Sequence, residues 1–122
     1  MLPVCCSLGL FLWGTALAAG EPCDRNPALE TWLTARTMEW ARLLTQLPGY
    51  EPPSPLQVCQ AAGKAPHTDG LHIYLPPLAE EEERLSLAHE YVHLALRHHP
   101  VAHDERYVEQ VARSLILGEQ LP

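Results

Sequence analysis

Apolar residues recur at helical spacing in three stretches of the chain. The first stretch lies between Asn26-Pro27, which are typical of a helix start, and Pro48-Gly49, which are typical of a stop. Its apolar stripe is formed by Leu29, Leu33, Trp40, Leu44 and Leu47, with Trp32 and Leu43 at the margins. This spacing predicts a helix that packs against the core.

The second stretch predicts a helix from about Leu78 to Arg97 or His98, where Pro100 forces the chain out of helical geometry. Its inward face would carry Leu85, Ala88, His89, Val92, His93 and Leu96. A third helix is predicted to begin around His103-Asp104 and to end at Gly118. Its apolar positions are Tyr107, Val108, Val111, Ala112, Leu115 and Ile116.

The region between the first two helices favours short strands. Residues 71–75 alternate apolar and polar side chains with period two, after a turn signal at Thr68-Asp69-Gly70. An apolar island, residues 56–59, lies inside the proline-rich segment 50–70 and fits a second strand that pairs with the first. The pattern therefore predicts an α+β domain, mostly helical, with a short β-ribbon and with the second helix packed between the other two.

The N-terminal segment predicts export. Residues 4–19 carry no charge, fall short of the ~20 apolar residues that a membrane-spanning helix needs, and end in the small-x-small pattern Ala16-Leu17-Ala18. We therefore expect a signal peptide over residues 1–19, a single domain over residues 20–122, and a periplasmic or extracellular location without stable membrane insertion after cleavage. No basic residue precedes Val4, so an uncleaved anchor is the alternative.

Cysteine usage agrees with an oxidising compartment. Removal of a signal peptide leaves only Cys23 and Cys59, and an even pair in a small exported domain predicts a disulfide. Closing this loop would contribute roughly 3–4 kcal/mol by the chain-entropy estimate. The alternative, that both cysteines bind metal, is disfavoured because neither has a second cysteine at zinc-site spacing.

The charge of the chain limits its partners. All charged residues follow residue 19, and the formal net charge is −7. Such a balance excludes nucleic acid and anionic lipid as expected partners.

The candidate chemistry is concentrated in the second predicted helix, which contains His89-Glu90-Tyr91-Val92-His93. Residues four apart lie on one helical face, so His89 and His93 can hold one metal ion. Glu90 would stand beside the metal without binding it, where a general base for a zinc-bound water is needed.

A catalytic zinc site needs a third protein ligand, and three residues compete for this role. His99 follows His93 at metzincin spacing, but Leu96 replaces the glycine that turns the chain. Glu105 lies at the start of the third helix, beyond a connection that contains proline, and Asp104 precedes it. The sequence favours Glu105 and leaves the other two open.

The motif together with Glu105-Arg-Tyr-Val-Glu109 resembles the gluzincin class of zinc metallopeptidases. This resemblance implies a minimal zincin with ligands His89, His93 and Glu105, base Glu90, and Glu109 as an acid that hydrogen-bonds a ligand histidine. Glu109 stands where the class usually has Asp, and the interval to the ligand is short. The run HEYxHLAxRHHP…DE…VE is also similar to the C-terminal part of an uncharacterised family of bacterial secreted proteins.

The expected function is an exported hydrolase that binds one zinc ion per chain and cleaves peptide or amide bonds of a peptide or protein substrate. Strand 71–75 would pair with the substrate as an edge strand. The candidate donors to the oxyanion are His72, His98, His99, His103 and Tyr107. The alternative is a catalytically silent, zinc-stabilised accessory module that docks on a larger envelope protein.

Overall fold

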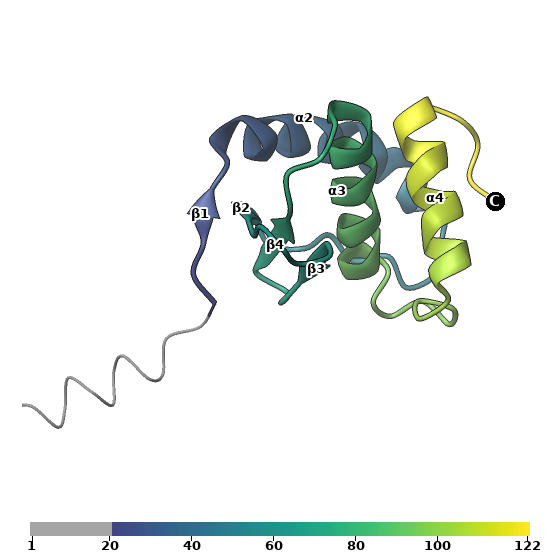
Figure 1. The fold of residues 1–122 in the computed structure, drawn as a ribbon. Coiled ribbons are helices and arrows are strands. Elements are labelled where there is room, and N and C mark those ends of the chain that lie inside the picture. The colour runs from purple at the N-terminus through teal and green to yellow at the C-terminus, as the bar shows by residue number, and fades with distance from the viewer. Residues whose placement is uncertain (1–20) are drawn as a thin grey trace, which may run out of the picture.

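The computed structural model describes residues 21–122, so the predicted signal peptide lies outside the described residues. The described part confirms the α+β class (Figure 1). Its helices are α2 (Pro27–Leu44), α3 (Glu80–Ala95) and α4 (Glu105–Leu117). Its strands are β1 (Asp24–Arg25), β2 (Gln57–Gln60), β3 (His67–Thr68) and β4 (His72–Leu75). Within residues 21–122, no helix has the length and apolar character needed to cross a membrane.

Side-chain caps fix where two of the helices begin. The Asn26 side chain accepts a hydrogen bond from the backbone N–H of Leu29, and Pro27 occupies the first turn of α2, as predicted. Asp104 caps α4 in the same way, by accepting from the backbone N–H groups of Arg106 and Tyr107. The helix ends are less well predicted, since α2 stops at Leu44, before the Pro48-Gly49 signal.

The strands form one mixed sheet in the order β1-β2-β4-β3, which is larger than the predicted ribbon. The expected pairing of residues 56–59 with residues 71–75 is confirmed, because β2 and β4 are neighbours. They run parallel, with Gln57 opposite His72, and the two short outer strands each add an antiparallel pair. Strand β4 is therefore interior, and the expectation that it is an edge strand is wrong.

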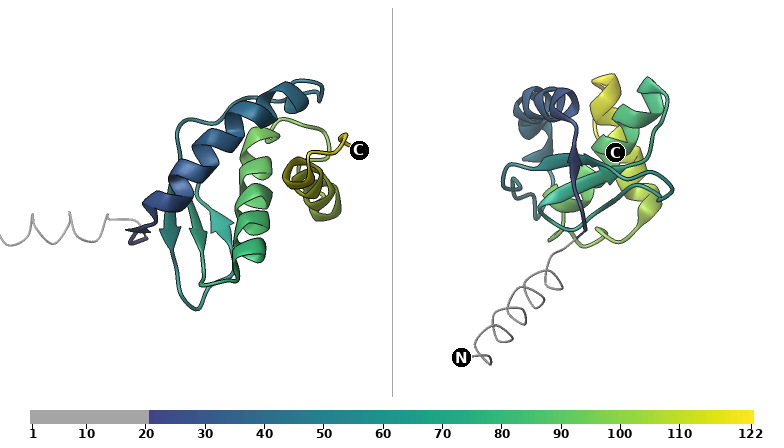
Figure 2. Two further views of the ribbon diagram at one scale, coloured as in Figure 1. Left: turned by 90° about the horizontal axis from the view of Figure 1, so that it is seen from above. Right: turned by 60° about the vertical axis from the view of Figure 1, so that its left-hand side comes forward.

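Helices α2 and α3 lie on one face of the sheet, and α4 packs against α3 (Figures 1 and 2). The core between these layers joins Val58, Ile73 and Leu75 of the sheet to the buried residues of all three helices. In α2 the buried residues are Leu29, Leu33, Trp40 and Leu44, as the stripe predicts. Figure 2 shows α3 between α2 and α4, and the rings of Trp40 and Tyr91 lie 5.8 Å apart where α2 meets α3.

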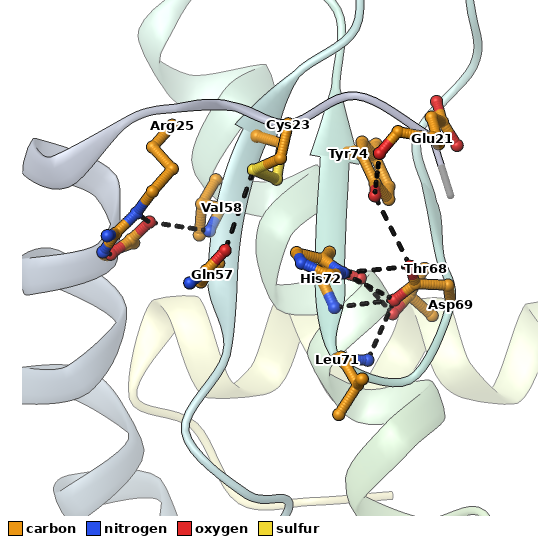
Figure 3. The surroundings of a disulfide bond; sticks show 12 residues. Glu21, Cys23, Arg25, Gln57, Val58, Thr68, Asp69, Leu71, His72 and Tyr74 are labelled. Atoms are coloured by element: carbon orange, nitrogen blue, oxygen red, sulfur yellow. Dashed lines mark hydrogen bonds and ion pairs between the residues drawn. A yellow bond between two sulfur atoms is a disulfide. The ribbon is translucent and has the colours of Figure 1, made fainter. Parts of the chain in front are cut away.

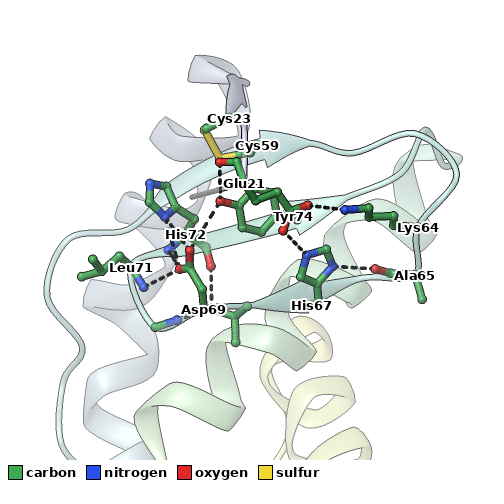
Figure 4. Close-up of polar contacts among 12 residues, drawn as sticks. Glu21, Cys23, Cys59, Lys64, Ala65, His67, Asp69, Leu71, His72 and Tyr74 are labelled. Atoms are coloured by element: carbon green, nitrogen blue, oxygen red, sulfur yellow. Dashed lines mark hydrogen bonds and ion pairs between the residues drawn. A yellow bond between two sulfur atoms is a disulfide. The ribbon is translucent and has the colours of Figure 1, made fainter. Parts of the chain in front are cut away.

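The N-terminal segment of the described chain crosses the opposite face of the sheet (Figure 3). The predicted disulfide between Cys23 and Cys59 is formed there. Glu21 then contacts Lys64 at 3.2 Å and the ring of His67 at 3.0 Å, and its carbonyl oxygen lies 3.4 Å from the Tyr74 hydroxyl (Figure 4). These contacts leave Tyr74 only 1% exposed. The period-two pattern of β4 therefore does not produce an exposed face.

A turn before β4 is organised by Asp69 (Figures 3 and 4). Its Oδ1 atom accepts hydrogen bonds from the backbone N–H groups of Leu71 at 2.9 Å and His72 at 2.8 Å. Partial burial alone would raise the pKa of Asp69, but these bonds and the His72 ring outweigh it and lower the pKa to about 2.

The segment after α2 is joined to the end of α3. Glu51 donates its backbone N–H to the Ala95 carbonyl and pairs with Arg97 at 2.8 Å. Gly49, with φ +76°, lies against the His98 backbone, where a Cβ atom would sit 2.6 Å from the carbonyl oxygen. Only glycine fits this position, because the backbone is left-handed and space for a side chain is absent.

We predict that Gly49→Ala lowers the free energy of unfolding more than Gly63→Ala does. Both glycines have positive φ, so alanine costs about 1–2 kcal/mol at either position. Gly63 has no neighbouring atom within 4 Å of an added Cβ, whereas the contact at Gly49 adds about 1–3 kcal/mol. Urea unfolding of the two variants measures the difference, and equal losses would contradict the close packing at Gly49.

We predict that Asp69 contributes stability that acid removes. Its pKa is about 2 in the folded protein and 3.8 when unperturbed, so the contribution is complete above 3.8 and is lost as the pH falls towards 2. The thermal unfolding midpoint of wild type should therefore fall more steeply over this range than that of Asp69→Asn. Asp24→Asn, which removes an exposed carboxylate from β1, is the control and should follow wild type.

Candidate metal centre

Helix α3 places His89 and His93 side by side at the margin of its buried face. The buried residues of the helix are Leu87, Ala88, Tyr91, Val92 and Ala95. The two histidines flank this stripe, with side chains 17% and 23% exposed and ring centroids 4.9 Å apart. The sequence predicts that both histidines face the protein interior, but their side chains are partly exposed. The Nε2 atom of each ring is therefore accessible to a ligand.

Glu105, the first residue of α4, meets both histidines. Its Oε1 atom lies 2.8 Å from Nε2 of His89 and 3.1 Å from Nε2 of His93. The three potential ligand atoms all lie within 4.8 Å of one another. These contacts lower the pKa of the Glu105 carboxyl, with the His89 hydrogen bond as the largest cause and the His93 bond next.

This donor set fits a zinc ion. Two imidazole nitrogens and one carboxylate oxygen are the ligands of one well-known class of catalytic zinc site. Around a tetrahedral ion with bonds of about 2.0–2.1 Å, ligand atoms lie about 3.3 Å apart. The two nitrogen–oxygen distances of 2.8 and 3.1 Å would widen by only a few tenths of an ångström to reach that spacing.

The other two candidates for a third ligand have different contacts. The Asp104 carboxylate caps α4. His99 accepts the backbone N–H of Val101 at its Nδ1 atom, and its ring stacks on Tyr107 with centroids 5.1 Å apart. Within residues 21–122, the group of side chains able to hold a metal therefore comprises His89, His93 and Glu105.

Glu90 follows His89 on α3 and is partly buried. Burial is the largest influence on its pKa and raises it, while the nearby rings of His93 and His89 act in the opposite direction. The sum leaves the pKa of Glu90 above its ordinary value. Glu90 is therefore a carboxylate next to the three potential ligands in a partly desolvated position.

Glu109 contacts the His89 ring at the nitrogen that faces away from Glu105. It lies one turn after Glu105 on α4, and its Oε1 atom accepts a hydrogen bond from Nδ1 of His89 at 2.8 Å. Burial would lower the pKa of His89, but the hydrogen bonds to Glu109 and Glu105 outweigh it and raise the pKa. A proton held on Nδ1 leaves Nε2 as the atom that can bind a metal.

Two residues near the site were not predicted from the sequence. His67 of β3 lies close enough to Glu90 for its charge to lower the pKa of that carboxyl. It occupies a proline-rich segment where no periodic pattern marks a strand. Arg113 contacts Glu109 at 2.9 Å. The two residues are four apart in the sequence, a spacing that could have predicted this ion pair on a helix.

Two of the five candidate oxyanion donors have acidic partners elsewhere. The His72 ring contacts Asp69 at 3.0 Å, on the other side of the sheet from the helices. His98 contacts Glu51 at 3.0 Å beyond the end of α3.

Comparison with known proteins identifies the family. Residues 11–101, which include the histidine motif, match the family described as "Predicted secreted protein (DUF2300)". The chain is also 32% identical over 107 residues to "Uncharacterized protein YfaQ" of Escherichia coli (strain K12), a match that covers 86% of this chain. No solved structure matches the chain.

The chain therefore belongs to the DUF2300 family of predicted secreted proteins, in agreement with the expected export and with the resemblance to an uncharacterised secreted family. It spans about a fifth of the relative's length, since the match covers 19% of YfaQ.

Proposed function

We propose that this protein binds one zinc ion through His89, His93 and Glu105 and hydrolyses peptide or amide bonds. The observation that carries the proposal is the convergence of these three ligand atoms beside Glu90. Zinc held there would polarise a substrate carbonyl and make a water molecule easier to deprotonate.

In this proposal, the residues of the chain position the metal and move protons. The Glu90 carboxylate accepts the proton of the attacking water and returns it to the leaving amine. Glu109 holds the His89 ring so that Nε2 points towards Glu105.

An extended substrate would pair with β3. This strand has β4 on one side only, so it is one of the two edges of the sheet, and the charge of its His67 slightly lowers the pKa of Glu90. Backbone groups on the outer side of an edge strand can bind a peptide by strand addition. The substrate-pairing role that the sequence assigns to residues 71–75 is therefore moved to β3.

A catalytically silent, zinc-stabilised accessory module is the second candidate function. Two observations favour it: the Glu105 side chain is 70% exposed, so the site is open, and the chain matches only 19% of a much longer relative. Such a module would dock on a larger envelope protein or on the remainder of a longer chain.

We predict that Glu105→Ala lowers zinc affinity more than about 100-fold, because it removes a direct ligand, whereas His99→Ala changes it little. Replacing both His89 and His93 with Ala should abolish stoichiometric binding. Competition with a chromophoric chelator measures the affinities. Equal small effects of Glu105→Ala and His99→Ala would refute the assignment of Glu105.

We predict that Glu90→Gln retains one zinc per chain but lowers kcat for hydrolysis at least about 100-fold, since the general base is lost. Metal analysis together with cleavage of a fluorogenic peptide library tests both parts. Glu39→Gln, a change in an exposed carboxylate of α2, is the control and should leave hydrolysis unchanged. Zinc binding without cleavage by wild type would favour the accessory module.

A further inference from the structure

Three charged residues lie along one stripe of α4, at spacings of four: Glu105, Glu109 and Arg113. Residues four apart on a helix are neighbours on one face, so the three side chains follow one another along the axis. The side chains form one line of contacts with α3. Arg113 Nε lies 2.9 Å from Glu109 Oε2, Glu109 Oε1 lies 2.8 Å from His89 Nδ1, and His89 Nε2 lies 2.8 Å from Glu105 Oε1.

The Glu109 carboxylate is held from two sides. One oxygen accepts a hydrogen bond from the His89 ring, and the other forms an ion pair with the Arg113 guanidinium at 2.9 Å. Because the two oxygens are joined through one carbon, a donor that fixes one of them also fixes the direction of the other. The orientation of Glu109 towards His89 therefore depends in part on a residue two helical turns beyond Glu105.

We infer that Arg113 is a positioning residue for the metal centre, acting through Glu109 on the orientation of the His89 ring. This inference rests on the proposed zinc site. Carboxylates that hydrogen-bond a ligand histidine keep its ring oriented and its metal-binding nitrogen deprotonated, and their loss typically costs about 10–100-fold in metal affinity. Arg113 acts one contact further out, so its loss should cost less.

The pair between Arg113 and Glu109 is poorly suited to a stabilising role. The Arg113 side chain is 61% exposed and that of Glu109 is 34% exposed. Ion pairs with such exposure contribute little to folding because water and salt screen them. A weak pair of this kind still biases the orientation of the Glu109 side chain, and the expected effect on zinc affinity is correspondingly small.

The test is zinc affinity of the full mature chain, measured with zinc alone by competition with a chromophoric chelator. We expect Arg113→Met to lower the affinity about three- to tenfold. Arg113→Lys retains a cationic donor and should recover part of the loss. The control is Arg36→Met, which removes an exposed arginine paired with Glu39 on α2 and should leave the affinity unchanged.

A double-mutant cycle separates positioning from a general structural effect. Glu109→Gln should lower zinc affinity about tenfold or more. If Arg113 acts through Glu109, Arg113→Met adds no further loss in that background. The unfolding midpoint of the metal-free protein should shift no more for Arg113→Met than for Arg36→Met.

The measurements distinguish failure of the role of Arg113 from failure of the proposed zinc site. Additive losses in the cycle, or wild-type affinity in Arg113→Met, overturn the role of Arg113 while leaving the zinc site intact. A wild-type chain that binds no zinc overturns the proposed metal centre and this inference with it. Non-additive losses together with partial recovery by Lys support the positioning role.

Discussion

The packing of α3 against α4 is the constraint on which the site depends. The apolar stripe of α3 and the buried face of α4, formed by Val108, Val111, Ala112 and Leu115, fix how the two helices are rotated and shifted relative to each other. That alignment brings the first residue of α4, Glu105, to the C-terminal half of α3. As a result, one carboxylate oxygen of Glu105 meets both imidazoles.

The sequence predicts which side chains of α3 and α4 come together here, because their spacing is local to each helix. The spacing of His89 and His93 is a property of any helix, and so is the spacing of Glu105 and Glu109. The choice of third ligand depends instead on the connection from Leu96 to Asp104. In this connection Asp104 caps the N-terminus of α4, a role typical of Asp before an apolar run. The His99 ring contacts Val101 and Tyr107 instead of the other two histidines.

The sheet is harder to predict because its pairing is not local. Strands β1 and β3 have two residues each, too few for a periodic pattern, and both exist through hydrogen bonds to longer neighbours. No turn motif in the sequence predicts the parallel pairing of β2 with β4, because parallel strands are joined by a long crossover connection and not by a short hairpin turn. The disulfide was predictable from cysteine count and compartment, but the burial of Tyr74 was not, because that burial requires the N-terminal segment to cross the sheet.

The charge of the site favours a cation over an anion as its ligand. Glu90, Glu105 and Glu109 gather around two histidines in a chain whose net charge is −7. With neutral imidazoles the three carboxylates face only one nearby cation in the described part of the chain, Arg113, and the repulsion among them rises as water is excluded. Burial alone would lower the pKa of His89, but its hydrogen bonds to Glu109 and Glu105 and the charge of Glu90 raise it, so a proton on this ring relieves part of that repulsion. A divalent cation held by both histidines and Glu105, as proposed above, would relieve it too. The same arrangement would repel an anion, so its electrostatics and its donor geometry favour the same kind of ligand.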